Sequence, residues 1–124
     1  MRLLLDTHAL LWWLADEGLN TGARDVIADP AHLVVVSAAS AWEISIKKAL
    51  GKLAAPDDLE QQVQTGGFVP LPITIAHGIV AGQLPHHHED PFDRMLIAQA
   101  FAEGLTIVTR DKRFNDYGVT LLTA

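Results

Sequence analysis

The chain has 124 residues, of which 49% are hydrophobic and 19% are charged, and its formal net charge is −6. This length suits one domain, residues 1–124, because two independent cores would each be too small to be stable. The composition excludes a disordered tail, and the apolar runs are too short to cross a bilayer. The absence of cysteine excludes disulfide bonds, thiolate catalysis and cysteine zinc sites.

The first residues do not resemble a secretory leader, because Asp6 interrupts the opening leucine run before any cleavage signal. We therefore expect a cytoplasmic protein. The negative net charge argues against a general attraction to nucleic acid, so phosphate contacts would depend on local basic residues. Two clusters of basic residues are present: Lys47, Lys48 and Lys52, and Arg110, Lys112 and Arg113. Each cluster taken alone is explained by a solvated face or by a helix C-terminus.

Apolar and β-branched runs predict buried strands, and helical patterns lie between them. The strands are expected at residues 3–5, 33–36 and 106–108. The helices are expected at about residues 9–16, 22–28, 38–50, 59–65, 75–83 and 91–103. Residues 69–71 and 119–122 could add short strands, although Pro70 and Pro72 make the first an edge strand or a loop. This alternation predicts an α/β fold, a three-layer α/β/α sandwich with a mainly parallel central sheet.

Four acidic residues lie where such a fold would bring them together. Asp6 ends the first strand, Asp111 follows the last one, and Asp93 lies in the first turn of the last helix. Glu43 lies on the helix that follows the second strand. Ligands of open α/β sheets bind beyond the carboxyl ends of the strands, so we expect these carboxylates to meet there.

Clustered carboxylates repel each other unless a cation or protons neutralise them. Hard divalent cations suit an environment of oxygen atoms, which predicts a site for Mg²⁺, with Mn²⁺ as a substitute. Such ions can activate a water and orient it toward a phosphorus atom. Chemistry on a phosphate group at such a cluster would need no side-chain nucleophile.

Each acid also has a simpler explanation. Asp6 could only cap the following helix, Asp93 could only favour a helix N-terminus, and Asp111 could only stabilise a turn. Glu43 could only pair with Lys47 one helical turn further on. From the pattern alone, a shared metal site and these local roles both remain open.

Four blocks in order along the chain carry a resemblance that covers almost its whole length: residues 4–8 (LLDTH), 37–44 (SAASAWEI), 88–100 (HEDPFDRMLIAQA) and 109–111 (TRD). They resemble the motifs of PIN-domain proteins, specifically the VapC-type toxins of bacterial toxin–antitoxin pairs. The resemblance implies a PIN-like fold and a magnesium- or manganese-dependent endoribonuclease that hydrolyses RNA through metal-activated water. It also implies a homodimer, or a hetero-oligomer with a cognate antitoxin protein.

The same resemblance gives the metal-site roles to Asp6, Glu43, Asp93 and Asp111. The first three would bind the metal or position its ligands, and Asp111 would act mainly through a metal-bound water. Asp90 is expected to cap its helix and could reach the site. Four residues with hydroxyl side chains could hydrogen-bond the carboxylates or a bound water: Thr7, Ser37, Ser40 and Thr109. Each of them could instead only cap a helix or end a strand.

Three further features each have two explanations or an open role. Arg110 stands where many relatives carry Asn, and its charge could contact RNA phosphate. The tract from His86 to His88 could bind a transition metal, but a solvated loop before a helix explains it. Trp12 and Trp13 could pack in the core or form part of a partner surface.

Other classes of protein fit less well. A haloacid-dehalogenase-like phosphatase would phosphorylate Asp6 but would need a second acid where His8 stands. A response-regulator receiver domain would need an aspartate at the end of the strand before Ser37. A PIN fold that has lost its activity and serves only as a binding partner remains the alternative, although the complete set of four acids argues against it.

Overall fold

Every residue from 1 to 124 is described in the structure, which is a computed structural model. Five strands form one sheet in the order β3-β2-β1-β4-β5, and all neighbouring strands are parallel. The strands are β1 Arg2–Leu5, β2 Leu33–Ser37, β3 Val69–Leu71, β4 Thr106–Thr109 and β5 Leu121–Thr123.

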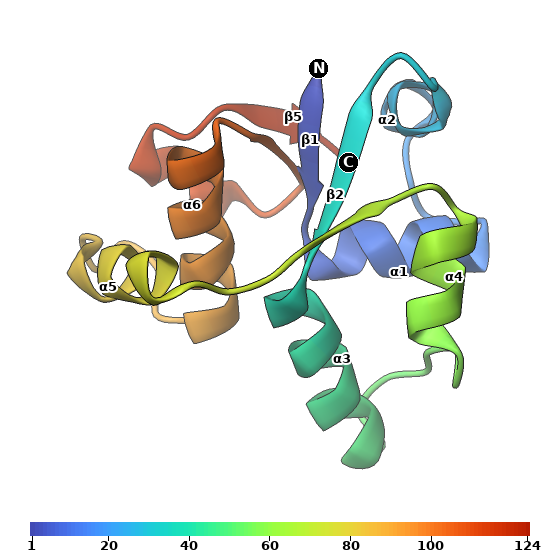
Figure 1. Cartoon of the computed structure of the whole chain (residues 1–124), viewed down its shortest axis with the longest axis horizontal. Coiled ribbons are helices and arrows are strands. Elements are labelled where there is room, and N and C mark those ends of the chain that lie inside the picture. Colours follow the sequence, from blue (N-terminus) through green and yellow to red (C-terminus); the bar gives the residue numbers. More distant parts are fainter.

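Helices cover both faces of this sheet. They are α1 Thr7–Ala15, α2 Thr21–Ala28, α3 Ala38–Ala49, α4 Leu59–Thr65, α5 Ile75–Gln83, α6 Pro91–Glu103 and the 3₁₀ helix η1 Lys112–Tyr117. Figure 1 shows α5 and α6 on one side of the strands, α1, α2 and α4 on the other, and α3 beyond the strand ends. The predicted three-layer α/β/α sandwich is therefore confirmed.

The alternation of side chains along β1 explains why the sheet has two cores. Leu3 and Leu5 pack in the core beneath α1 and α2, whereas Leu4 packs in the opposite core against α6. Successive side chains of a strand point to opposite faces, and all three leucines are fully buried. A strand that is apolar at every position is thus required at the centre of the sheet.

Two elements depart from the expected pattern, the first helix and the segment after Asp111, whereas β3 is the edge strand that the sequence allowed. The first helix begins at Thr7, because the Asp6 side chain accepts a hydrogen bond from Ala9 and caps it. The run that contains Pro70 forms the edge strand β3, where proline is tolerated because one side of the strand needs no ladder hydrogen bonds. The segment after Asp111 forms η1, which the sequence pattern did not predict.

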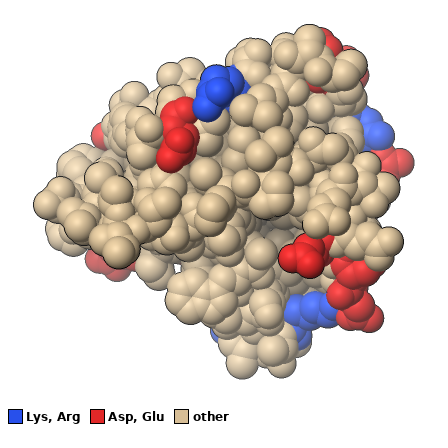
Figure 2. All heavy atoms as spheres, in the orientation of Figure 1, with Lys and Arg blue, Asp and Glu red and all other residues tan.

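A cavity of about 500 Å³ lies between α4 and the ends of β2 and β3, with Asp57 and Glu60 among the residues that line it. In Figure 2 most of the visible surface is uncharged, and acidic side chains lie at the edge of a hollow. None of the helices combines the length and the apolar character that crossing a membrane requires.

Candidate metal centre

The carboxyl edge of the sheet positions two of the predicted acids. Asp6 follows β1 and Asp111 follows β4, and these two strands are neighbours. Asp6 is buried, and its Oδ1 accepts a hydrogen bond of 2.7 Å from the backbone N–H of Ala9. Asp111 caps η1 and accepts from the backbone N–H of Arg113 at 3.0 Å. Both acids therefore cap helices, which the local explanation expected of Asp6 alone, and both lie at the edge where a ligand would bind.

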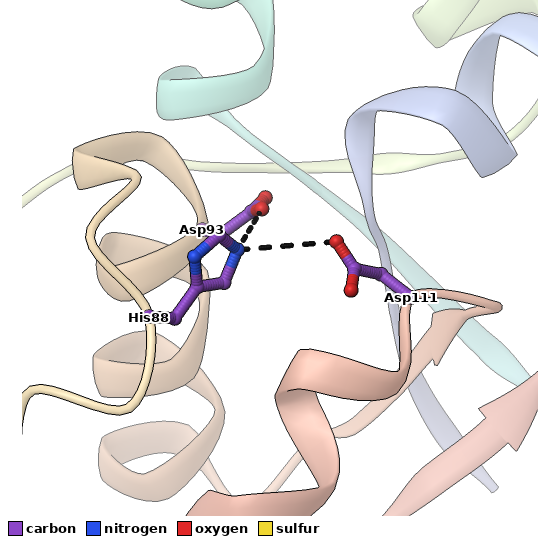
Figure 3. A group of neighbouring side chains, drawn as sticks. All are labelled: His88, Asp93 and Asp111. Carbon is purple, nitrogen blue, oxygen red and sulfur yellow. Dashed lines mark hydrogen bonds and ion pairs between the residues drawn. The ribbon is translucent and has the colours of Figure 1, made fainter.

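His88 connects Asp111 with the third acid, Asp93. Its Nε2 lies 2.7 Å from Oδ2 of Asp93 and 3.9 Å from Oδ2 of Asp111. Figure 3 shows Nε2 of the imidazole facing both carboxylates, which come from the start of α6 and the segment after β4. The ligand atoms of these three residues all lie within 4.8 Å of one another. The structure thus brings Asp93 and Asp111 together around a histidine.

The expectation of a solvated loop is wrong for His88, which is only 2% exposed. His86 and His87 are exposed, so the description holds for them. The difference arises because the loop turns inward just before α6, and three adjacent side chains cannot face the same way. The signal that could have identified His88 was its place at the start of the block that also contains Asp93.

Glu43 projects from α3 and is 3% exposed. Its Oε1 accepts a hydrogen bond of 2.6 Å from the Thr7 hydroxyl, which lies 3.3 Å from the hydroxyl of Ser40. Its Oε2 forms an ion pair of 2.6 Å with Lys47. The helical pair with Lys47 therefore exists, and in addition a hydroxyl from the helix that Asp6 caps holds the carboxylate in place.

Two of the four acids resist ionisation. Burial raises the pKa of Asp6, although hydrogen bonds from Thr109 and Ala9 oppose this effect. Burial and the nearby charge of Asp90 raise the pKa of Asp93 to about 7, while the hydrogen bond with His88 acts in the opposite direction. Neither carboxylate has an ion pair with a lysine or an arginine.

The other two acids each have a cation from their own element. Arg113 donates from Nε and Nη2 to both carboxylate oxygens of Asp111, at 3.0 and 2.7 Å, and these bonds hold the pKa of Asp111 below its ordinary value. The ion pair with Glu43 raises the pKa of Lys47. Half of the acidic cluster is thus already neutralised, and the other half is not.

The remaining polar residues differ in how closely they approach the acids. Asp90 caps α6 through the backbone N–H groups of Phe92 and Asp93, at 2.8 and 3.0 Å. Thr109 accepts from the backbone N–H of Asp111 at 3.1 Å. Ser37 instead donates to Gln99 at 2.6 Å and caps α3, so its hydroxyl contacts none of the four acids.

Arg110 also contacts none of the four acids. Its guanidinium lies over the ring of Trp12, 3.8 Å from the centroid, and donates to the carbonyls of Gly18 and Ala124 at 2.5 and 2.8 Å. This side chain therefore joins the end of α1 to the end of β5. Trp13 packs its ring against Phe68 in the core.

Arg94 is a residue whose role the sequence pattern did not reveal. It is 8% exposed, and its guanidinium donates to the backbone carbonyls of Ala81, Leu84, Pro85 and His88. These bonds fasten the segment between α5 and α6 to α6 itself. The buried charge thus fixes the loop that delivers His88 to the acidic cluster.

Residues 3–119 match the PIN domain family. The chain belongs to this family. Ribonuclease VapC22 of Mycobacterium tuberculosis is 30% identical to it over 122 residues, which are 92% of this chain and 90% of that protein. The relationship places the chain among the VapC-type members of the PIN-domain family, as the four sequence blocks implied.

Solved structures agree on the PIN fold. The VapBC2 structure from Rickettsia felis, bound to a DNA fragment, matches with a TM-score of 0.72 and 13% identity over 98% of both chains. The DNA-bound VapBC structure from Salmonella typhimurium matches with a TM-score of 0.72 and 17% identity over 98% of this chain and 97% of that one. At these identities the likeness shows the fold alone.

The chemistry of the acidic cluster fits a hard divalent cation. The four carboxylates offer oxygen atoms, which Mg²⁺ and Mn²⁺ prefer. Asp6 and Asp93 carry raised pKa values and have no lysine or arginine partner, so a bound cation would relieve the cost of ionising them. Asp6 and Asp93 are therefore the two carboxylates whose ionisation a nearby cation would favour most.

Proposed function

We propose that this protein is a metal-dependent endoribonuclease that hydrolyses RNA phosphodiester bonds, and that it acts as the toxin of a toxin–antitoxin pair. Asp6, Glu43, Asp93 and Asp111 would hold Mg²⁺, and Mn²⁺ could replace it. The observation that carries the proposal is the meeting of acids from distant parts of the chain, two of which have no cationic partner.

The residues around these acids would have separate tasks. A bound divalent ion supplies the charge that activates water and stabilises the departing oxygen. Thr7 holds Glu43 at 2.6 Å, and Asp90 caps the helix turn that carries Asp93. Lys47, which lies near Asp93, would attract the phosphate of the RNA. The chain's own groups thus orient the carboxylates and bring substrate to them.

The proposed partners come from the relatives. VapC22 is named a ribonuclease, and the structures from Rickettsia felis and Salmonella typhimurium are VapBC complexes bound to DNA. A complex from Klebsiella pneumoniae is a toxin–antitoxin complex. We propose that this chain likewise binds a cognate antitoxin protein, and that it forms a homodimer or a toxin–antitoxin hetero-oligomer in the cytoplasm.

Cleavage of a structured RNA pool by the purified protein tests the enzymatic part. We expect cleavage with Mg²⁺ or Mn²⁺, no cleavage with EDTA, and near-complete loss of cleavage in Asp93→Asn. Asp25→Asn is the matched control, because Asp25 is an exposed acid on α2 and belongs to no ion pair. Equal cleavage by wild type and Asp93→Asn would refute the assigned chemistry. Binding of a partner without any cleavage would favour the inactive PIN fold instead.

Induced expression in a bacterial host tests the toxin part. The wild type should arrest growth, and Asp93→Asn should not, because arrest would require RNA cleavage. Sequencing of RNA ends after brief induction would then identify the cleaved RNA. Growth at the uninduced rate in several hosts, with the protein folded and present, would contradict the toxin role.

A further inference from the structure

We propose that His88 is a positioning residue, which donates its Nε2–H to Asp93 and holds that carboxylate ready for the metal without binding the metal itself. The inference rests on the proposed function, because it assigns a role inside the same site. It concerns a residue that the sequence pattern left as part of a solvated loop or, alternatively, as a ligand of a transition metal.

The hydrogen bonds of the ring decide which nitrogen carries the proton. The backbone N–H of Asp90 lies 3.3 Å from Nδ1 of His88 and points to it. A backbone N–H can only donate, so Nδ1 must accept with its lone pair. In the neutral ring the proton then resides on Nε2, which lies 2.7 Å from Oδ2 of Asp93 and donates to it.

This arrangement argues against His88 as a metal ligand. A histidine binds a metal through a nitrogen lone pair, while its other nitrogen usually donates a hydrogen bond. Binding through Nε2 would place a proton on Nδ1, directly opposite the N–H of Asp90, and two donors would face each other. The local backbone therefore selects the form of the ring that donates to Asp93.

The loop is built to hold the ring in this place. The Tyr117 hydroxyl accepts from the backbone N–H of His88 at 2.8 Å, and Arg94 donates to its carbonyl oxygen at 3.3 Å. Phe114 packs edge-on against the imidazole, with the ring centroids 6.0 Å apart. Three residues from α6 and η1 thus fix the backbone and the ring, which is 2% exposed.

The hydrogen bond leaves Asp93 suitably arranged for a cation. It occupies Oδ2 and fixes the carboxylate plane, so Oδ1 keeps its lone pairs for a metal. The same Nε2 is 3.9 Å from Asp111, too far for a hydrogen bond, so its proton serves Asp93 alone. Partners of this kind, which hold a ligand without touching the metal, typically change metal affinity by about 10- to 100-fold when removed.

Two matched substitutions separate the positioning role from a role in folding. Asn at position 88 offers an oxygen that can accept from the N–H of Asp90, but its side chain is too short to reach Asp93. Gln at the same position extends an amide N–H toward Asp93. His86→Asn is the control, because His86 is an exposed neighbour with no side-chain hydrogen bond to an acid.

Calorimetric titration with Mn²⁺ alone, melting temperatures and cleavage kinetics would test the proposal. For His88→Asn we expect a Kd for Mn²⁺ about 10- to 100-fold higher than in wild type, a melting temperature within a few degrees and an unchanged KM for RNA. His88→Gln should recover most of the affinity, and His86→Asn should match wild type. Mg²⁺ and Co²⁺ should lose affinity by similar factors.

Several outcomes would overturn the inference. Wild-type affinity in His88→Asn would show that Asp93 does not need the hydrogen bond. If His88→Gln bound Mn²⁺ no better than His88→Asn, the ring would have a role other than donating to Asp93. If His88→Asn lost affinity for Co²⁺ alone, His88 would be a metal ligand. An unfolded His88→Asn would show that the ring is structural. If wild type binds no Mn²⁺, the proposed metal-dependent function itself fails, which is a separate result.

Discussion

The two halves of the acidic cluster are neutralised in different ways. Glu43 and Asp111 each pair with a cation that lies four or two residues further along the same element. Asp6 and Asp93 have no such partner, and their pKa values are raised. Glu43 and Asp111 are thus neutralised by basic residues close to them in the sequence, whereas no lysine or arginine neutralises Asp6 or Asp93. The binding free energy of a metal ion should therefore come mainly from its interaction with Asp6 and Asp93.

The largest expected effect is on catalysis. Asp6→Asn and Asp93→Asn should each lower kcat by about 100-fold or more, the scale seen when a preorganised group is removed from an active site. Asp111→Asn should cost about 10-fold, the smaller loss expected of a group that acts mainly through an intermediary such as a bound water. Single-turnover cleavage in saturating Mn²⁺ measures all three. If Asp111→Asn were as damaging as the others, the distinction between the two halves would be wrong.

The second prediction concerns stability without metal. The pKa of Asp93 is about 7 in the folded protein and near 3.8 ordinarily, so between these values the folded state keeps a proton that the unfolded state has lost. Stability must then fall as pH rises through this window, and burial of Asp6 acts in the same direction. In EDTA the melting temperature should drop by about 5 °C between pH 5 and pH 7.5.

Asp93→Asn provides the control for that experiment. The titratable and charged groups near Asp93 all remain in the variant: His88, Asp90, Glu43, Lys47, Asp111 and Arg113. Its melting temperature in EDTA should therefore depend less on pH, and at pH 7.5 it should exceed that of wild type. Parallel curves for the two proteins would show that Asp93 ionises without cost.

The sequence predicted the layers of the fold and the approach of Asp93 and Asp111, because apolar runs and strand ends follow from local pattern. It could not predict the orientation of side chains such as His88, since that depends on Arg94 and Tyr117 holding the loop. Arg110 likewise seemed to lie beside the site, but its side chain turns toward Trp12. Chain position fixes where a backbone lies, and packing across elements decides where its side chain points.

A smaller effect is expected at Lys47, whose ammonium neutralises Glu43 at 2.6 Å. Lys47→Gln should bind Mn²⁺ up to about fivefold more tightly. The substitution removes a positive charge that competes with the metal for Glu43 and whose interaction with that carboxylate is worth roughly 1 kcal/mol. The KM of Lys47→Gln for RNA should rise, because a phosphate contact is lost. Lys48→Gln is the matched control, since Lys48 pairs with Asp57 instead. Unchanged Mn²⁺ affinity in Lys47→Gln would show that this cation does not compete with metal.

The smallest effect is expected at Arg113, although it binds both oxygens of Asp111. Its side chain is 63% exposed, so water and salt screen the pair. In Arg113→Ala the backbone N–H still donates to Oδ1 of Asp111 at 3.0 Å, which preserves the orientation of the carboxylate. The Kd for Mn²⁺ should change less than about twofold, as in the control Lys112→Ala. A larger change than in Lys47→Gln would mean that Asp111, and not Glu43, lies closer to the metal.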